Sequence, residues 1–122
     1  MPISTYLANK WLDTLRNVSF GVATLYASLH MDDPGDTGAN EVSGGSYARR
    51  SVTLAAAANK GTSNSAMLEW TNMPAVTVSY VGLWDAATGG NFLWGGQLAQ
   101  AKTLYAGDTF RIAVGDLDIT QS

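Results

Sequence analysis

Apolar residues recur along the chain at two spacings, first at helical intervals and then at every second position. Residues 4–16 carry apolar side chains three and four positions apart, and Ser4 or Thr5 can cap the start. This segment is therefore predicted to be one short amphipathic helix. From Gly21 the spacing changes to two, which predicts a strand with one apolar face. The residues on that face are Ala23, Leu25, Ala27 and Leu29.

Short strands separated by turn signals are predicted to follow up to residue 121. The clearest is a hairpin in which residues 76–84 and 92–97 pair across the turn 86–91, where two glycines can take positive φ. The other expected strands are 47–54, 66–70, 102–105, 109–114 and 117–121. Residues 30–46 and 55–65 lack periodicity and are expected to be surface loops.

The order of these elements indicates a mainly β fold. About seven or eight short strands are typical of an antiparallel β-sandwich, here jelly-roll-like, with one short N-terminal helix. A parallel α/β fold is not expected, because the crossover helices it needs are missing. At 122 residues the chain has the size of one domain. Residues 1–20 are interpreted as a helical segment that docks onto a partner or closes one end of the sandwich, and residues 21–122 as the sandwich.

Charged residues make up only 14% of the chain, against roughly 25% in an ordinary soluble domain. Much of the surface must then be uncharged, as in surfaces that contact other proteins. A net charge of −3 argues against nucleic-acid binding, which depends on clustered Lys and Arg. No apolar run is long enough to span a membrane and the start does not resemble a signal peptide, so synthesis in the cytoplasm is expected. Without cysteine, robustness is expected from a symmetric homo-oligomer.

Residues that could carry catalysis are few. His30 is the only histidine, and no serine stands in a nucleophile motif such as G-x-S-x-G. A histidine at the end of a strand, bonded to loop backbone, is the favoured interpretation. Asp116 and Asp118 alternate on one strand as a glycosidase pair could, but such acids more often guard a sheet edge. We therefore expect no catalytic residue and no cofactor.

The acidic loop raises the possibility of a calcium site, because hard cations bind several carboxylate oxygens. Its acids are Asp32, Asp33, Asp36 and Glu41. Their spacing does not match an EF-hand, since Gly35 stands where a ligand is needed. A turn in which an aspartate such as Asp36 bonds backbone amides is favoured, and no metal is expected.

Aromatic residues gather in the part of the chain with the best strand signals. They are Trp70, Tyr80, Trp84, Phe92 and Trp94. Core packing is the favoured explanation. However, Trp84 and Trp94 flank one hairpin, where cross-strand neighbours could form an apolar platform. Such a platform could be a subunit interface or a carbohydrate-binding surface, and composition leaves both open.

Three long blocks of the sequence resemble a known family. They are ATLYASLHMDDPGDTGANEVSGGSYAR (residues 23–49), LEWTNMPAVTVSYVGLWDAATGGNFLWGGQL (68–98) and AGDTFRIAVGDLDIT (106–120). Together they resemble a small virion protein found in tailed bacteriophages and prophages, usually labelled phage tail fibre protein. The resemblance implies a structural component of the virion without catalytic residues.

The position in the virion is a separate question. We favour a capsid decoration protein on the outer surface of the head, where a trimer would cement neighbouring copies of the major capsid protein. The alternative is a tail fibre or tail-tip subunit that contacts a host-surface glycan, partly through residues 32–41. A third hypothesis is a hydrolase or esterase acting on envelope glycans. The candidates for interface or ligand contact are Trp11, Leu15, Trp84, Trp94, Asp33 and Asp36.

Overall fold

The computed structural model describes residues 3–22, 24–59 and 61–120, which form one helix and eight strands. The helix is α1 (Thr5–Thr14), and the strands are β1 (Leu25–His30), β2 (Arg50–Val52), β3 (Gly61–Ser63), β4 (Leu68–Met73), β5 (Val76–Trp84), β6 (Phe92–Leu104), β7 (Asp108–Ile112) and β8 (Asp118–Thr120). Every strand pair is antiparallel. The prediction of a mainly β, antiparallel fold with one short N-terminal helix is therefore confirmed. The expected strand face at Ala23 lies outside the described residues.

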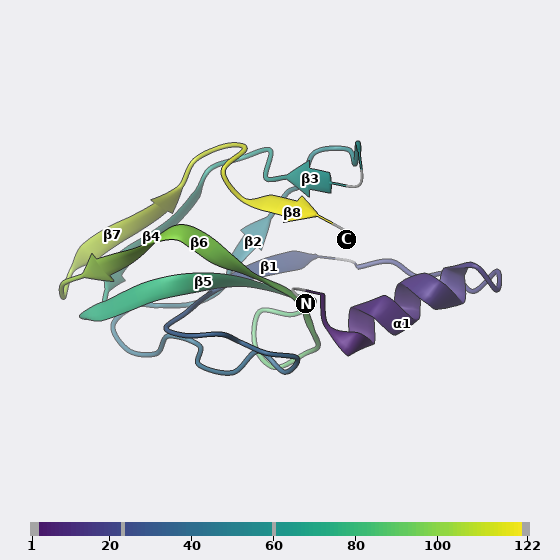
Figure 1. The fold of residues 1–122 in the computed structure, drawn as a ribbon. Coiled ribbons are helices and arrows are strands. Elements are labelled where there is room, and N and C mark those ends of the chain that lie inside the picture. The colour runs from purple at the N-terminus through teal and green to yellow at the C-terminus, as the bar shows by residue number, and fades with distance from the viewer. Residues whose placement is uncertain (1–2, 23, 60, 121–122) are drawn as a thin grey trace.

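Helix α1 begins where polar groups satisfy its free backbone amides. The Ser4 hydroxyl accepts a hydrogen bond from the Leu7 amide at 3.1 Å, as an N-cap does. The Asp36 carboxylate, from the distant acidic loop, accepts one from the Thr5 amide at 2.6 Å. Only Leu7 is buried in the helix, because α1 touches the body mainly at β6 and then extends away from it (Figure 1). Among the described residues, no helix has the length and apolarity needed to cross a membrane.

Four strands form the main sheet in the order β2-β1-β5-β6, and the remaining strands form the pairs β3-β8 and β4-β7. Both pairs lie on the same side of the main sheet (Figure 1). The core fills the space between them with residues such as Leu29, Trp70, Val81 and Phe110. The arrangement is sandwich-like. The finer prediction of a jelly roll is not confirmed, because the strands outside the main sheet form two separate pairs.

The segment 31–46 covers the opposite side of the main sheet (Figure 1). Its backbone is tied to the end of β1 on both sides: the Met31 amide donates to the Asn40 carbonyl and the Val42 amide to the Leu29 carbonyl, each at 2.9 Å. For this reason β1 is buried on both faces at its end, with Ser28 and His30 as fully buried as Leu29. The alternation in the sequence predicted only one buried face.

Gly82 in β5 makes room for the buried polar side chains under this segment. It lies opposite Ser28 in the register of the sheet. A Cβ atom at Gly82 would lie 2.6 Å from the Ser28 hydroxyl oxygen and 2.7 Å from His30 Nε2. Contacts that short cannot be accommodated without moving the loop or the strand.

Some strands differ from the pattern-based prediction. Residues 92–104 form one strand, β6, rather than two, because a register shift between Val78 and Tyr80 of β5 accommodates the extra residues. The expected loop 55–65 contains β3, which pairs with β8. The expected strand 109–114 ends at Ile112, so Val114 lies beyond β7 and is exposed.

Candidate functional site

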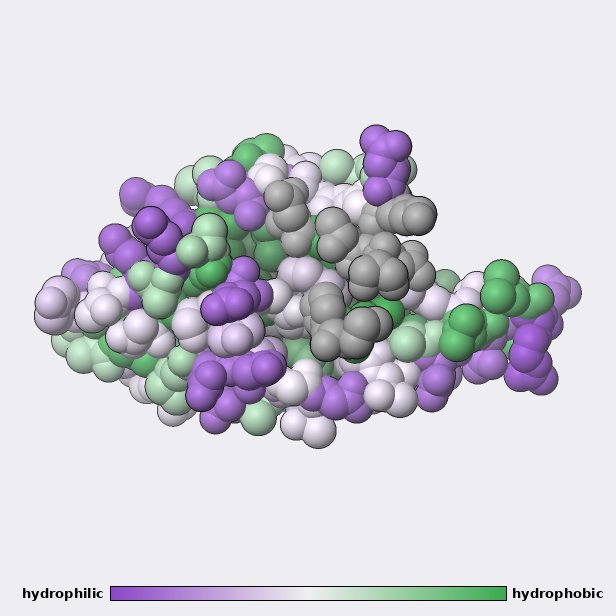
Figure 2. All heavy atoms as spheres, viewed as in Figure 1, coloured by the Kyte–Doolittle hydropathy of each residue, from purple (hydrophilic) through white to green (hydrophobic). Residues whose placement is uncertain are grey.

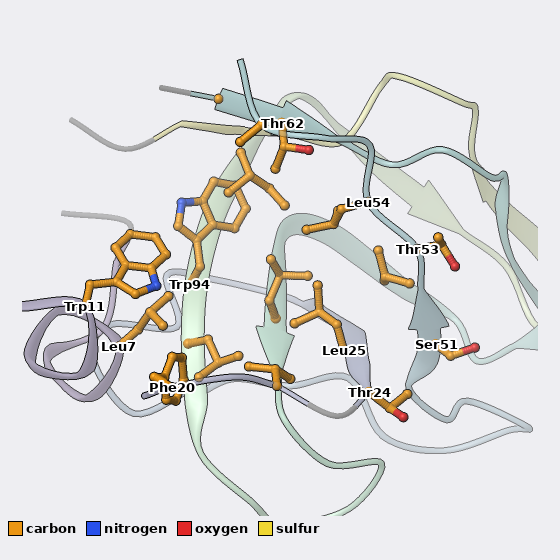
Figure 3. Close-up of a pocket in the computed structure, with 17 residues that line it drawn as sticks. Leu7, Trp11, Phe20, Thr24, Leu25, Ser51, Thr53, Leu54, Thr62 and Trp94 are labelled. Atoms are coloured by element: carbon orange, nitrogen blue, oxygen red, sulfur yellow. The ribbon is translucent and has the colours of Figure 1, made fainter. Parts of the chain in front are cut away.

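An open apolar groove lies between α1 and the main sheet, with a volume of about 730 Å³ (Figure 3). Leu7 and Trp11 line it from α1, and Leu25 and Trp94 line it from β1 and β6. Hydroxyl groups of Thr24, Ser51, Thr53 and Thr62 are its polar side chains, and among the described residues that line it none is charged. The groove can therefore accept an apolar surface, with little to attract an ion.

Trp94 brings a polar atom to this apolar groove. Its side chain is almost entirely buried, with 6% of the residue exposed, and its ring lies over Gly96, where a Cβ would overlap it. The indole Nε1 has no hydrogen-bond partner among the described residues. A buried N–H without an acceptor is unfavourable by about 1–3 kcal/mol. Trp94 can therefore donate a hydrogen bond to a group that enters from outside.

Apolar side chains on α1 continue outward from the groove. Leu12, Leu15 and Val18 are 62%, 84% and 46% exposed. Figure 2 shows apolar residues gathered at the far end of the projecting helix. Since residues three and four apart share a helix face, Leu15 continues the stripe formed by Leu7 and Trp11. An exposed stripe of this kind is typical of a surface that contacts protein.

The structure brings some of the predicted contact residues together and separates others. Trp11 and Trp94 line the same groove, and Leu15 lies one helical turn beyond Trp11. The expected platform of Trp84 and Trp94 does not form. Leu83, not Trp84, is the cross-strand partner of Trp94, so the two tryptophans point to opposite faces of the sheet. Trp84 is also only 7% exposed, so the platform prediction is wrong.

Trp84 instead belongs to a buried cluster that holds segment 31–46 in place. The guanidinium carbon of Arg49 lies 3.6 Å from the centroid of the Trp84 ring, a cation–π contact. Arg49 Nε and Nη2 each donate to the Glu41 carboxylate at 3.0 Å. Its Nη1 donates to the carbonyls of Ala86 and Gly89 in the β5–β6 turn, at 3.1 and 2.8 Å. One arginine thus joins the loop, the ring and the turn.

Tyr47 completes the cluster. Its hydroxyl donates to the Glu41 carboxylate at 2.7 Å and accepts from the Leu29 amide at 2.9 Å. Burial raises the pKa of Tyr47 well above its usual value, so the hydroxyl stays protonated and remains a donor. Sequence reasoning missed Arg49, Glu41 and Tyr47 as a group. The alternation of Tyr47 and Arg49 was the only local signal that their side chains share a face.

His30 and Ser28 form a buried hydrogen-bonded pair. The Ser28 hydroxyl lies 2.6 Å from His30 Nε2 and accepts from Trp84 Nε1 at 2.8 Å. His30 Nδ1 lies 2.8 Å from the Ala39 carbonyl, which can only accept, so Nδ1 carries a proton. Burial lowers the pKa of His30 and thereby favours the neutral ring, in which Nε2 accepts from the Ser28 hydroxyl. The predicted bond from a strand-end histidine to loop backbone is confirmed. Both residues are fully buried, so no substrate reaches this Ser–His pair.

The three aspartates of the acidic loop use their carboxylates for backbone hydrogen bonds. Asp33 accepts from the Gly35 amide at 2.9 Å, which forms a local turn. Asp36 was expected to bond backbone within its own turn, but it bonds the Thr5 amide at the start of α1. Within the part of the chain that the structure describes, no three His, Cys, Asp or Glu residues are placed to hold a metal ion. The side chain of Asp118 lies outside the described set, so the Asp116–Asp118 hypothesis has no geometry.

Comparison with known proteins identifies one family. A family model described as podophage GP4 fiber I protein gp80 matches residues 2–120, nearly the whole chain. No curated protein matches the chain significantly.

The Arg49 cluster yields a stability prediction. Replacing Arg49 with Lys keeps the charge but removes the two-pronged contact with Glu41 and the planar stacking on Trp84. We expect the free energy of unfolding to fall by about 1–3 kcal/mol, measured by urea denaturation followed by circular dichroism. The matched control is Arg111→Lys, since Arg111 pairs with Glu69 at an exposed site. The control is expected to change stability by no more than about 0.5 kcal/mol, and equal losses in both variants would contradict this role for Arg49.

Acidification is expected to weaken the fold through His30. Burial lowers the pKa of His30 from its usual value of 6.5, because it disfavours the charged imidazolium. The unfolded chain then binds a proton at higher pH than the folded chain. The free energy of unfolding should therefore fall as pH drops below about 6.5, by at most about 1.4 kcal/mol per pH unit. Burial raises the pKa of Glu41, but hydrogen bonds from Arg49 and Tyr47 outweigh this and lower it from 4.5, so Glu41 acts only at lower pH.

The measurement compares urea unfolding of the original chain and His30→Asn between about pH 5 and pH 7. Asn keeps an amide donor for the Ala39 carbonyl but does not titrate. Because His30 is the only histidine, the variant should lose most of the pH dependence in this range. The same slope in both proteins would show that His30 is not the responsible group.

Proposed function

The chain belongs to the family of the podophage GP4 fiber I protein gp80, which makes it a structural component of a phage virion, and from this premise we propose that it is a subunit of a fibre on the outer surface of the particle. It self-associates there as a homotrimer and contacts neighbouring virion proteins. The observation that carries the proposal is the projecting helix α1, whose Leu12 and Leu15 are exposed beside an apolar groove. Such surfaces suit assembly, because apolar area exposed on the free subunit is removed from water in the assembly.

The proposal includes no enzymatic activity. Two observations support this. The Ser28–His30 pair is sealed under segment 31–46 and already bonded to Trp84 and Ala39. Within the described part of the chain, no side chain that lines the groove beside α1 carries a charge with which it could act as acid or base.

Direct recognition of a host-surface glycan is a weaker part of the fibre hypothesis. Sugar rings usually stack on exposed aromatic faces, and the ring expected for this role, Trp84, is covered by Arg49 and Phe92. We therefore assign the chain an assembly role within the fibre and leave receptor contact to other virion proteins.

Capsid decoration is the second candidate. The body is a compact β domain, and within the described residues there is no elongated shaft of the kind that long fibres use. A trimer that cements the major capsid protein would use the same exposed helix for docking. The description of the matched family, which names a fiber protein, is the reason to place decoration second.

Labelling of intact particles tests the proposal. Antibodies against this chain, visualised with gold in electron microscopy, should mark fibres, with an antibody against the major capsid protein as the control that marks the head. Copy number by quantitative mass spectrometry should match a small set of fibres. Dense labelling over the whole head, with hundreds of copies, would replace the fibre proposal with decoration. Absence of the chain from purified particles would contradict both.

A further inference from the structure

Helix α1 uses only part of its apolar stripe within its own subunit. Leu7 is buried against the body and Trp11 is partly buried at the edge of the groove. Leu12 and Leu15, which lie on the same side of the helix, are left in solvent with Val18 just after it. The unused part of the stripe lies on the length of helix that projects beyond the body (Figures 1 and 2).

The groove is also unused within the subunit. After Leu7 and Trp11 are in place, about 730 Å³ remains open, within the range of pockets that bury small ligands. In Figure 3, Leu54 and Thr53 lie on the side of the groove opposite Trp11. One edge is thus occupied by the helix of the same copy, and no other described part of the chain fills the remaining volume, which could receive another apolar element.

Neither the groove nor the exposed stripe of α1 carries an unpaired charge among its described residues. Among the residues that the structure describes, the groove is lined by uncharged side chains only. At the end of α1, the charges of Asp13 and Arg16 neutralise each other, because Arg16 Nη1 lies 3.3 Å from the Asp13 carboxylate. These described residues would therefore bring no unpaired charge into the contact, and it is the desolvation of unpaired charges that is unfavourable.

We infer that the projecting part of α1 from one copy packs Leu12, Leu15 and Val18 into the Trp94 groove of a second copy. The contact rests on the proposed assembly function and specifies how the subunits join. The carbonyls of Leu12 and Thr14 each accept one amide of their own chain. Because a carbonyl oxygen has two lone pairs, each can accept a second hydrogen bond, and the arriving helix end therefore brings acceptors for the unpaired Trp94 Nε1. The buried N–H is then satisfied by the neighbouring copy.

The geometry of such a contact determines the type of assembly. The helix and the groove are different surfaces, so each copy gives its helix to one neighbour and receives a helix from another. This is a heterologous contact, which closes into a ring when the rotation per step divides a full turn. A ring of three such steps would give the trimer.

Disulfide trapping between two singly substituted proteins tests the contact, since the chain has no cysteine of its own. One protein carries Leu15→Cys, and the other carries Thr53→Cys at the rim of the groove and a larger tag. After mixing and mild oxidation, a disulfide between the two proteins of different size is expected on a non-reducing gel. The matched control replaces Thr53→Cys by Val114→Cys, because Val114 is also exposed, at 59%, but lies outside the groove, and it should not cross-link.

A second measurement uses the double variant Leu12→Ser/Leu15→Ser. Because both leucines are exposed, the fold should be retained, which circular dichroism verifies. Self-association measured by sedimentation should weaken at least about tenfold, and Met67→Ser/Val114→Ser at other exposed apolar sites should leave it unchanged.

The other outcomes would overturn the inference. Disulfides only between two copies of Leu15→Cys would mean that the helices pair with each other, and an unchanged oligomer in the double variant would mean that the helix is not the interface. Retained virion incorporation of the double variant, with self-association also retained, would assign the groove to a small ligand or another virion protein. None of these results would contradict the fibre proposal. The fibre proposal alone would be contradicted if the disulfide formed as expected but the chain were absent from purified particles.

Discussion

The position of the Arg49 guanidinium, between the Trp84 ring and the Glu41 carboxylate, is the constraint on which the rest of the structure depends. Through Glu41 it fixes the return of segment 31–46, and through the Ala86 and Gly89 carbonyls it fixes the turn between β5 and β6. A buried guanidinium is unfavourable unless most of its donors have acceptors. Four of the five N–H groups of Arg49 have acceptors, in Glu41 and in the turn at Ala86 and Gly89, and the Trp84 ring lies against the guanidinium. These parts of the chain must therefore come together for Arg49 to be buried.

This constraint explains which residues of the molecule are buried and which surface is left for external contacts. With segment 31–46 held down, Ser28, His30 and Trp84 become interior residues, and the hydroxyl and imidazole groups that could suggest catalysis serve packing instead. In the acidic loop, the carboxylates of Asp33 and Asp36 likewise accept hydrogen bonds from backbone amides. What remains unsatisfied lies at the other end of the molecule, where α1 and the Trp94 groove expose apolar surface and an unpaired N–H. Because the other polar and aromatic groups are already buried or bonded, we expect assembly to use α1 and the Trp94 groove.

The parts of the fold that local patterns could predict are those governed by periodicity. The helix at α1 with its Ser4 cap and the strand β5 agree with spacing and capping rules. Strand β3 was not predictable in this way, because Gly61, Thr62 and Ser63 have no apolar alternation and become a strand only by pairing with β8. The site was harder still. Trp11 and Leu15 could be found on the helix stripe. The alternation of Tyr47 and Arg49 does not reveal that Arg49 is covered while its neighbour Arg50 is exposed. The register that pairs Leu83, not Trp84, with Trp94 is set by sheet pairing.

The central claim is that segment 31–46 is a fixed layer of the fold, which leaves α1 and the groove to make the external contacts. Hydrogen–deuterium exchange of the free and the assembled protein, followed by mass spectrometry, tests this most directly. The account predicts that peptides covering 31–46 exchange as slowly as β1 in both states, while peptides covering residues 8–18 exchange quickly in the free subunit and become protected on assembly. Rapid exchange of 31–46 in the free subunit, with protection appearing there and not in α1 on assembly, would contradict it.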